Sequence, residues 1–439
     1  MTKLTPIIGM EVHIEPSTLS KMFCGCSQDH FGKKPNTQVC PICLGLPGAL
    51  PFANKEGVFK TVKLGLALGS QISKFSKFYR KNYFYPDLPK GFQTSQLDSP
   101  LCIGGTLNGM KLNHIHLEED AGKLVHETIE GEKYSLVDFN RSGCALIELV
   151  TEPVFHDVIS VINFVKSLQL VARYLDVSNA DMEKGSMRLE ANVSLATEAQ
   201  IEKGELPNYR VELKNINSFK FLEKAVNAEL VRQKEAIEKG EKLIQETRGY
   251  DEAKQTTYSQ RTKDDAHDYR YFPEADLPPI ELTEEEIQSI KKELPELPTQ
   301  KEERFESEYG LTKEFAEILV SDRKRADYFE KVFELGKNNN LSARMVADLM
   351  INKKMDLEFV EPGSLVKKIL ELSNVEYSTS QEVVKAVNSV IMTNEKAVND
   401  YKSGNGNVIS FLIGMVQKEL KGKGKIEVVR EELTKQIQK

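Results

Sequence analysis

The stretch from His114 to Asp120 gathers side chains that could hold a metal ion. It contains two imidazoles and three carboxylates within seven residues, with apolar residues among them. Strand alternation would place both histidines, Glu118 and Asp120 on one face and Glu119 on the other. Two carboxylates about 4 Å apart repel by roughly 4 kcal/mol at an effective dielectric of about 20. The stretch is therefore either a cation site or a polar strand edge that faces solvent.

Residues 7–15 have the same construction and predict a first strand. Their even-numbered positions are apolar, whereas Glu11 and His13 share the other face beside Gly9. A carboxylate and an imidazole two residues apart on a strand can offer two ligands to one metal ion. Gly9 would clear space next to them, and an exposed outer face is the alternative.

Residues 144–150 form an apolar run in which Glu148 is the only ionisable group. A buried carboxylate is costly unless it is paired or bound to a metal. We therefore expect Glu148 to be a ligand or an ion-pair partner. Three separate stretches thus predict acidic and imidazole side chains that converge on a divalent cation.

Four cysteines are spaced for a closed zinc site. Cys24 and Cys26 are followed, after thirteen intervening residues, by Cys40 and Cys43. Two such pairs suit tetrahedral coordination by four thiolates, which leaves no open position and makes the predicted Zn²⁺ structural. A disulfide is disfavoured because the chain has the character of a cytoplasmic protein, with no apolar run of transmembrane length and no signal-peptide core.

Residues 78–91 interleave aromatic rings with lysine and arginine. The side chains of Lys81, Asn82, Tyr83 and Tyr85 could stack on a base and contact phosphates, as in sites for nucleotides or single-stranded RNA. A packed loop with snorkelling cations is the alternative. Arg270 lies near carboxylates in another strand-like segment, an arrangement that phosphate-binding surfaces use.

The elements that must position these residues predict an α+β fold. Clean alternation predicts strands at 187–195 and 209–214, whose polar residues share one face. Amphipathic spacing predicts helices at 44–68, 154–175 and 219–239. Prolines between 277 and 298 indicate a linker around one short acidic helix, and the chain beyond Lys301 is helical.

The pattern and the composition shifts predict three domains. They are a catalytic cradle of antiparallel strands at 1–291 with a zinc knuckle at 24–43, a helical domain at 292–365, and a helical tail at 366–439. The formal net charge of −7 means that any RNA contact must use a local basic patch. Four lysines of the tail, Lys418, Lys421, Lys423 and Lys425, form such a patch, and a solvated helix face is the alternative.

The chain has neither a Walker-type loop nor a dinucleotide fingerprint. Any nucleotide would therefore be held on the sheet by divalent ions that carboxylates bind. Such a site favours phosphoryl transfer, in which metal ions bridge phosphate oxygens and arginines neutralise the developing charge.

Several long motifs resemble the B subunits of the aspartyl/glutamyl-tRNA amidotransferases. The matching stretches are residues 9–13, 80–90, 116–123, 138–152, 212–219, 245–248 and 268–274. The resemblance implies a cradle related to the catalytic domain of glutamine synthetase, followed by helical and tail domains that hold tRNA. It also implies a ligase that uses ATP to phosphorylate the side-chain carboxylate of Glu misacylated on tRNA(Gln) or of Asp on tRNA(Asn).

The resemblance further implies site residues and partners. Carried over by motif, the Mg²⁺ ligands would be Glu11, His13, Glu119 and Glu148, with Glu118 a near alternative to Glu119. The phosphates or the acceptor end of tRNA would be contacted by Asn140, Arg141, Arg188 and Lys214. No amidase signature is evident, so ammonia would come from an amidase A subunit, in a heterotrimer that also contains a small C subunit.

Two rival functions belong to other classes. A small-molecule ATP-dependent amide ligase of the glutamine synthetase type would need neither the basic tail nor the aromatic and basic segment. A zinc-containing RNA-binding scaffold without catalysis would need neither Glu11 nor His13.

Overall fold

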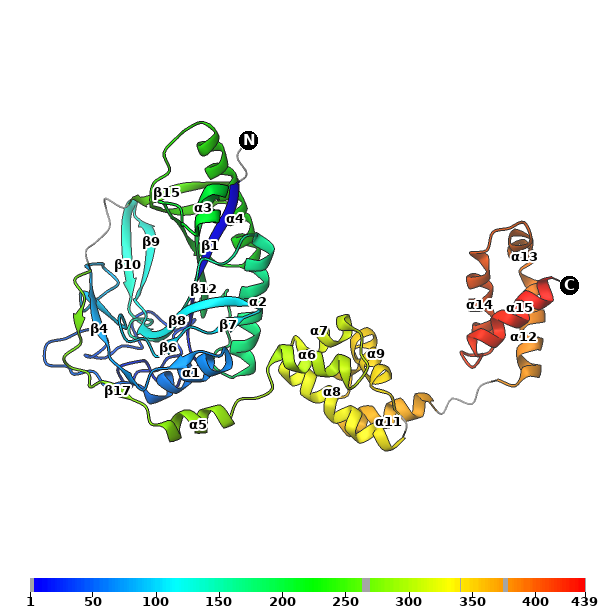
Figure 1. The fold of residues 1–439 in the computed structure, drawn as a ribbon. Coiled ribbons are helices and arrows are strands. Elements are labelled where there is room, and N and C mark those ends of the chain that lie inside the picture. The colour runs from blue at the N-terminus through cyan, green and yellow to red at the C-terminus, as the bar shows by residue number, and fades with distance from the viewer. Residues whose placement is uncertain (1–3, 263–268, 340, 374–377, 439) are drawn as a thin grey trace. The chain divides into compact units, whose positions relative to one another are not determined.

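The computed structural model describes residues 4–262, 269–339, 341–373 and 378–438 (Figure 1). The chain divides into two compact units, residues 1–307 with 320–323, and residues 308–319 with 324–439. The described strands all lie in the first unit, and the described elements of the second unit are helices. The fold is therefore α+β, with a sheet-rich first part and a helical second part, as the pattern predicts.

The first unit is built on one large sheet. Its strands run in the order β15-β14-β13-β12-β1-β11-β8-β6-β2, and β7 also pairs with β8. They are β1 (Leu4–Ile14), β2 (Gln71–Ile72), β6 (Cys102–Ile103), β7 (Thr106–Leu107), β8 (Met110–Glu119), β11 (Ala145–Thr151), β12 (Met187–Thr197), β13 (Val211–Ile216), β14 (Glu246–Asp251) and β15 (Thr256–Thr262). Within the described sheet, β13 and β14 are the one parallel pair.

Strand β1 lies inside this sheet and separates an apolar face from a polar face. Ile8, Met10, Val12 and Ile14 are fully buried, as the alternation predicts. Helices α1 (Lys55–Ala67), α2 (Val158–Tyr174) and α4 (Phe219–Glu238) share their hydrophobic core. Figure 1 shows α2 and α4 on one side of β1 and β12. The odd-numbered residues of β1 are left for the opposite face.

Capping residues set where two of these helices begin. Asp157 caps α2 and Ser218 caps α4, each accepting a hydrogen bond from a backbone N–H of the first turn. These helices confirm the predictions at 154–175 and 219–239. The predicted helix at 44–68 is wrong before Lys55, because Pro47 and Pro51 interrupt the helical hydrogen bonds and residues 44–54 form turns and coil.

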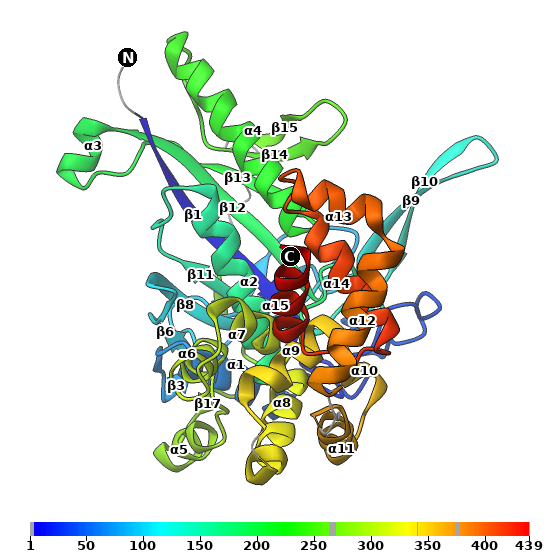
Figure 2. The same ribbon diagram turned by 90° about the vertical axis from the view of Figure 1, so that its right-hand side faces the viewer.

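Smaller elements surround the sheet. Strands β4 (Tyr79–Asn82), β5 (Phe92–Ser95) and β16 (Phe272–Pro273) form a small sheet that brings two distant parts of the chain together. Strands β9 (Lys123–Ile129) and β10 (Glu132–Asp138) form a hairpin that extends away from the large sheet (Figures 1 and 2). Strands β3 (Phe75–Ser76) and β17 (Ile280–Glu281) pair with each other, and the unit also contains α3 (Glu198–Lys203), α5 (Glu284–Lys292) and α6 (Pro298–Ser307). Helix α5 is the short acidic helix expected within the linker.

The second unit is helical throughout its described residues. Its elements are α7 (Lys313–Val320), α8 (Arg323–Gly336), the 3₁₀ turn η2 (Lys337–Asn339), α9 (Ala343–Lys353), α10 (Met355–Glu358), α11 (Pro362–Ser373), α12 (Ser380–Thr393), α13 (Glu395–Lys402), α14 (Val408–Glu419) and α15 (Ile426–Ile437). Ser342 caps α9 and Thr379 caps α12. Helices α12 to α15 share a core that includes Val387, Leu412 and Leu433. Among the described residues, no helix combines the length and the apolar character needed to cross a membrane.

Candidate metal and phosphate site

Polar side chains from five neighbouring strands share one face of the large sheet. They are Glu11, His13, His116, Glu118, Glu148, Arg188, Glu190, Asn192, Glu212 and Lys214. Antiparallel pairing aligns them across the strands, because Glu148 is the register partner of both His13 and His116. Residues far apart in the chain therefore meet on this face, as the alternation in each strand predicts.

The first ligand group joins His13, Glu118 and Glu148. One ligand atom from each lies within 4.8 Å of the others. The Nε2 atom of His13 is 3.3 Å from Oε2 of Glu148 and 3.9 Å from Oε1 of Glu118. His116 lies beside the group, with its Nε2 atom 3.4 Å from Oε2 of Glu148. Two carboxylates and an imidazole at this spacing can hold one divalent cation.

The carboxylates of this group favour the protonated form of the neighbouring imidazoles. Burial alone lowers the pKa of His13, but Glu148 and the neighbouring carboxylates outweigh burial and raise the pKa to about 9. The same balance raises the pKa of His116 to about 10. Burial raises the pKa of Glu148, and the two histidines more than reverse this, so its pKa lies well below the usual range. Two buried carboxylates here thus attract positive charge.

His114 and Glu119 do not belong to this ligand group. The rings of His114 and His116 stack with centroids 5.1 Å apart, and burial together with the charge of His116 lowers the pKa of His114 to about 4. The pairing of β8 with β11 is regular from Ile115 to Glu119, so Glu119 lies on the face opposite Glu118. The motif resemblance names Glu119 as a ligand, but the structure brings Glu118 to His13 and Glu148.

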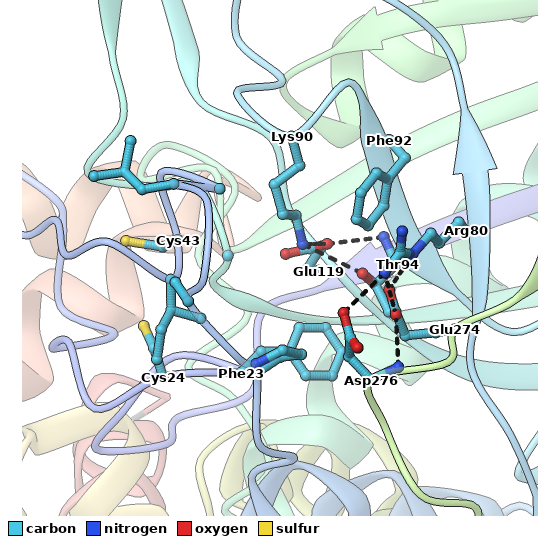
Figure 3. Close-up of a pocket in the computed structure, with 16 residues that line it drawn as sticks. Phe23, Cys24, Cys43, Arg80, Lys90, Phe92, Thr94, Glu119, Glu274 and Asp276 are labelled. Carbon is cyan, nitrogen blue, oxygen red and sulfur yellow. Dashed lines mark hydrogen bonds and ion pairs between the residues drawn. The ribbon is translucent and has the colours of Figure 1, made fainter.

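Glu119 instead faces a small cavity of about 170 Å³ beneath the cysteine loop. Its carboxylate accepts hydrogen bonds from the ammonium group of Lys90 and from the backbone N–H of Thr94. Figure 3 shows this ion pair beside the pair that Arg80 forms with Glu274. The carboxylate of Glu119 is therefore paired on its own side of the sheet.

A second ligand group joins Glu11, Glu190 and Glu212, which the sequence patterns did not predict as a group. One oxygen from each carboxylate lies within 4.8 Å of the others. Burial and the charges of Glu148 and Glu190 raise the pKa of Glu11. The Nζ atom of Lys214 is 2.8 Å from Glu190 and 3.3 Å from Glu212, so its ammonium partly balances the group. The available signal was the alternation of the strands at 187–195 and 209–214, which placed Glu190 and Glu212 on one polar face.

Two other predicted residues, Arg188 and Arg141, lie beside Asp120, and a third, Asn140, lies against the cysteine loop. An Nη2 atom of Arg188 donates to Asp120 at 2.5 Å, and the Nε atom of Arg141 lies 3.6 Å from the same carboxylate. Arg141 also donates to the carbonyls of Ala121 and Gly122. Asn140 is buried and bonds to residues 34 and 38 of the cysteine loop. Of the three, only Arg188 lies on the polar face.

The aromatic and basic segment places one cation near the first group. The Nζ atom of Lys81 lies 4.9 Å from the centroid of the Tyr269 ring, and it has no carboxylate within ion-pair distance in the described residues. Burial lowers the pKa of Lys81, but Glu118 and other nearby groups more than reverse this and raise it. Tyr83 packs edge-on against Tyr269. Lys81 therefore adds positive charge beside the first ligand group.

The rest of that segment has other partners. Asn82 donates to the backbone carbonyl of Arg270 at 2.8 Å, so these two residues join β4 to the chain that leads into β16. Tyr85 is exposed on the loop between β4 and β5. Asp268, which begins the last matching stretch, lies outside the described residues.

The four cysteines of residues 24–43 meet as the spacing predicts. Their Sγ atoms all lie within 4.8 Å of one another, and those of Cys40 and Cys43 are 3.8 Å apart. Tetrahedral zinc with bonds of about 2.3 Å requires sulfurs roughly 3.8 Å apart, so the donor set fits Zn²⁺. Hydrogen bonding with Cys24 lowers the pKa of Cys43 to about 5, and the charge of Lys21 contributes. Cys102 and Cys144 are buried outside this group.

Lys21 connects the cysteine loop to the large sheet. It is fully buried, and its Nζ atom donates to the carbonyls of Gln38 at 2.7 Å and Ser142 at 2.8 Å. Ser142 lies three residues before β11, the strand that carries Glu148. The cysteine group is thus part of the support beneath the polar face.

In the second unit, the four predicted tail lysines surround one turn. Lys418 lies in the last turn of α14, and Lys421, Lys423 and Lys425 occupy the turn before α15, all with exposed side chains. The backbone of Lys421 has a positive φ of 52°, which lets the chain reverse there. The turn concentrates positive charge on an acidic chain.

Known protein families match almost all of the chain. The family described as GatB/GatE catalytic domain matches residues 6–288, and the family described as GatB domain matches residues 312–437. Curated relatives named as the B subunit of aspartyl/glutamyl-tRNA(Asn/Gln) amidotransferase include one from Thermomicrobium roseum, 42% identical with 98% of each chain covered. Another, from Thermotoga maritima, is 41% identical with 99% of each chain covered. A relative from Clostridium acetobutylicum with the same name, numbered 2, is 42% identical with 98% of each chain covered.

Proposed function

The chain belongs to the family of B subunits of aspartyl/glutamyl-tRNA(Asn/Gln) amidotransferases, and we propose that its first unit performs the ATP-dependent step of tRNA amidation. The substrate is glutamate esterified to tRNA(Gln), aspartate esterified to tRNA(Asn), or both. The first unit phosphorylates the side-chain carboxylate, and ammonia from a partner protein then replaces the phosphate.

The observation that carries this proposal is the pair of ligand groups on one face of the sheet. His13, Glu118 and Glu148 form one group, and Glu11 belongs to the other with Glu190 and Glu212. Carboxylate oxygens with a single imidazole suit hard divalent cations such as Mg²⁺. Mg²⁺ held by these residues would neutralise the charge that develops on the phosphate oxygens.

Basic residues beside these groups would serve the reacting anions. Lys81 lies next to the first group, and Lys214 lies within the second. Arg188 lies on the same face, and its Nε atom is buried without a hydrogen-bond partner among the described residues. Ammonium and guanidinium groups so placed would orient the triphosphate and the substrate carboxylate and balance their charge.

The proposed reaction has two steps. A side-chain carboxylate oxygen attacks the γ-phosphorus of ATP, and the bond from phosphorus to the bridging oxygen breaks, with its electron pair leaving on ADP. The product is an acyl phosphate. Ammonia then attacks the acyl carbon, the bond from carbon to the phosphate oxygen breaks, and phosphate leaves with the electron pair. The nitrogen loses one proton, and the amide remains on the tRNA.

This scheme requires partners. The chain has no amidase signature, so ammonia must be produced elsewhere, and we propose an amidase A subunit with a small C subunit in a heterotrimer. The tail lysines Lys418, Lys421, Lys423 and Lys425 would contact the phosphate backbone of misacylated tRNA. We also propose that the cradle resembles the glutamine synthetase catalytic domain, and that the domains divide near residues 291 and 365.

The test is ATP turnover by the reconstituted complex with each misacylated tRNA supplied in turn. We expect Glu-tRNA(Gln), Asp-tRNA(Asn) or both to stimulate release of ADP and formation of the amide. Correctly charged Gln-tRNA(Gln) is the matched control and should not stimulate it. Turnover without any tRNA that survives deletion of residues after 307 would instead indicate a small-molecule ligase. Full function of a Glu11→Ala, His13→Ala variant would indicate a non-catalytic scaffold.

A further inference from the structure

A buried ammonium group lies beside the cysteine group of residues 24–43. Lys21 is 0% exposed, which is rare for a lysine. Within the described part of the chain, its Nζ atom has no carboxylate at ion-pair distance. A buried charge is costly unless an opposite charge compensates it. The fold must therefore supply Lys21 with negative charge of another kind.

Two acidic side chains at the end of β8 and just after it already have cations of their own. Figure 3 shows Glu119 bound to the ammonium group of Lys90. Asp120 pairs with Arg188 at 2.5 Å. Both carboxylates are therefore compensated without Lys21, and neither is its missing partner.

Three backbone carbonyls and one sulfur surround the Nζ atom of Lys21. It donates to the carbonyl oxygens of Gln38 at 2.7 Å and Ser142 at 2.8 Å, and the carbonyl oxygen of Phe139 lies 3.5 Å away. The Sγ atom of Cys43 is 3.8 Å from the same nitrogen. The carbonyls satisfy the N–H groups but carry no net charge, so the sulfur is the one of these four partners that can carry an opposite charge.

Metal binding would give the cysteine group the negative charge that Lys21 needs. Zinc is bound by deprotonated cysteines, so four thiolates around one Zn²⁺ carry two net negative charges. An ammonium group beside one of the sulfurs compensates one of these charges inside the loop. Four neutral thiols would instead leave the ammonium group buried without an opposite charge. The four-cysteine donor set and the buried lysine thus suit each other when a metal is bound.

Gly143 brings the two partners together. Its backbone has a φ of 81°, and its carbonyl accepts a hydrogen bond from the N–H of Met22 at 2.8 Å. A Cβ at this position would lie 3.2 Å from the Cβ atom of Cys43 and 3.8 Å from the Cδ atom of Lys21. The segment that supplies the Ser142 carbonyl can therefore pack directly against the cysteine loop. Lys21 lies within this contact, away from solvent.

We propose that Lys21 is the counter-ion of the metal-loaded cysteine group, and that zinc affinity therefore depends on a residue that is not a ligand. The ammonium group compensates part of the thiolate charge, and the carbonyls of Gln38 and Ser142 hold it beside Cys43. Because the cysteine group has no residue in common with either carboxylate group, this role of Lys21 does not depend on the proposed ATP-dependent reaction.

The zinc affinity of full-length variants provides the test. Lys21→Gln removes the charge and keeps N–H donors for the carbonyls, whereas Lys21→Met removes both. Lys34→Met is the matched control, because Lys34 is an exposed lysine of the same loop. Competition with a chromophoric chelator would measure the zinc affinity of each variant. Co²⁺ in place of zinc would report on the sulfur electrons through its charge-transfer absorption.

We expect both substitutions at Lys21 to weaken zinc binding about 100-fold, because groups that contact metal ligands contribute strongly to metal affinity. Lys34→Met should stay within about threefold, since salt screens an exposed charge. The absorption of the Co²⁺ form should move to longer wavelength in both Lys21 variants, because sulfur electrons are held less tightly without a nearby positive charge. Unchanged zinc affinity in Lys21→Gln would overturn the proposal, because hydrogen bonding and not charge would then explain any loss in Lys21→Met.

A measurement on the unsubstituted protein covers the case in which the variants do not fold. Removal of zinc by a chelator should raise modification of Lys21 by an amine-acylating reagent about tenfold or more, because the ammonium group loses its opposite charge and the loop opens. Lys301 is the control, since it is also buried and lies 3.9 Å from the carboxylate of Glu296, and its modification should not change. Protection of Lys21 that persists without zinc would overturn the proposal, as would a full-length protein that binds neither zinc nor Co²⁺.

Discussion

The cysteine group and the carboxylate groups of the first unit are built in opposite ways. Four thiols come from one loop of residues 24–43 and surround a point completely. Each carboxylate group instead has three ligands from three different strands. A four-ligand zinc site leaves no position for a substrate, whereas a three-ligand group leaves positions for phosphate oxygens and water. We therefore propose that the cysteine group serves the fold and that the carboxylate groups serve the chemistry.

The strongest test of this contrast removes one carboxylate without changing its shape. Glu148→Gln should lower tRNA-dependent ATP turnover about 100-fold or more, because several kcal/mol of charge stabilisation by the metal is lost. The melting temperature should fall as well, because the Glu148 carboxylate also pairs with His13 and His116, so turnover is compared per folded molecule. Glu152→Gln, on the segment just after the same strand and outside both ligand groups, is the matched control and should retain turnover. A Glu148→Gln variant with normal turnover would contradict the assignment of the carboxylates to chemistry.

Removing a thiolate should mainly lower the stability of the fold and leave turnover nearly unchanged. Cys40→Ser should release bound zinc and lower stability by about 2 kcal/mol, or roughly 4–8 °C in melting temperature, since structural zinc contributes to folding. Turnover per folded molecule should change by less than about threefold, because the site has no open position for a substrate. Metal content by mass spectrometry, thermal melts and steady-state rates would measure the three quantities.

The double variant Cys24→Ser, Cys40→Ser provides the control for this prediction. If both cysteines bind one zinc, the second substitution should add little to the loss of stability. Additive losses, or a loss of turnover at an unchanged melting temperature, would place the cysteine group in another role.

A smaller effect is expected at the cation beside the first group. Lys81→Met should lower kcat/KM for the misacylated tRNA about tenfold, corresponding to about 1.4 kcal/mol of lost attraction to an anionic substrate. Lys77→Met is the matched control, because Lys77 lies outside the polar face over the ring of Tyr79. Equal losses in the two variants would show that general surface charge, and not the position of Lys81, determines the rate.

The smallest expected effect concerns an ion pair that belongs to neither kind of group. Arg80 binds Glu274 through two hydrogen bonds of 2.7 and 2.6 Å and so joins β4 to the chain after β16. Burial raises the pKa of Glu274, but hydrogen bonding to Arg80 outweighs burial and lowers the pKa below its ordinary value of 4.5. A lowered carboxyl pKa stabilises the fold above the ordinary pKa, and this contribution is lost as the pH falls below it.

Glu274→Gln should therefore destabilise the protein by about 1 kcal/mol at pH 7, with turnover and zinc content unchanged. The difference from the unsubstituted protein should disappear as the pH falls below 4.5. Denaturant unfolding at several pH values measures it, with Asp276→Asn, the more exposed second partner of Arg80, as the control. A difference that persists at low pH would assign the effect to packing.

Local patterns predicted the parts of the site that depend on one segment. The spacing of the cysteines predicted a closed four-ligand group, and the alternation in β1 predicted that Glu11 and His13 share the polar face. Alternation in β8 also placed Glu118 and Glu119 on opposite faces, and the structure agrees with this where the motif resemblance differs. The two-residue alternation within a strand thus predicted which face of the sheet each side chain occupies.

Register between strands could not be predicted from these patterns. The second group exists because Glu190 pairs directly across from Glu11 and Glu212 pairs across from Asn192. Nothing within a single strand fixes such a partner, so Glu11 was expected in one group with His13. The hydrogen bonds of the Asn140 amide could not be predicted either, because they depend on a long-range contact with residues 34–38.

The position of β1 between β12 and β11 has a consequence for how this chain can vary. Insertion of one residue between Gly9 and His13 would turn Glu11 into the core and an aliphatic side chain toward solvent, and would disturb both ligand groups at once. The β9–β10 hairpin has no ligand residue and no second partner strand among the described elements. Length differences between related chains should therefore accumulate in that hairpin and be absent from β1.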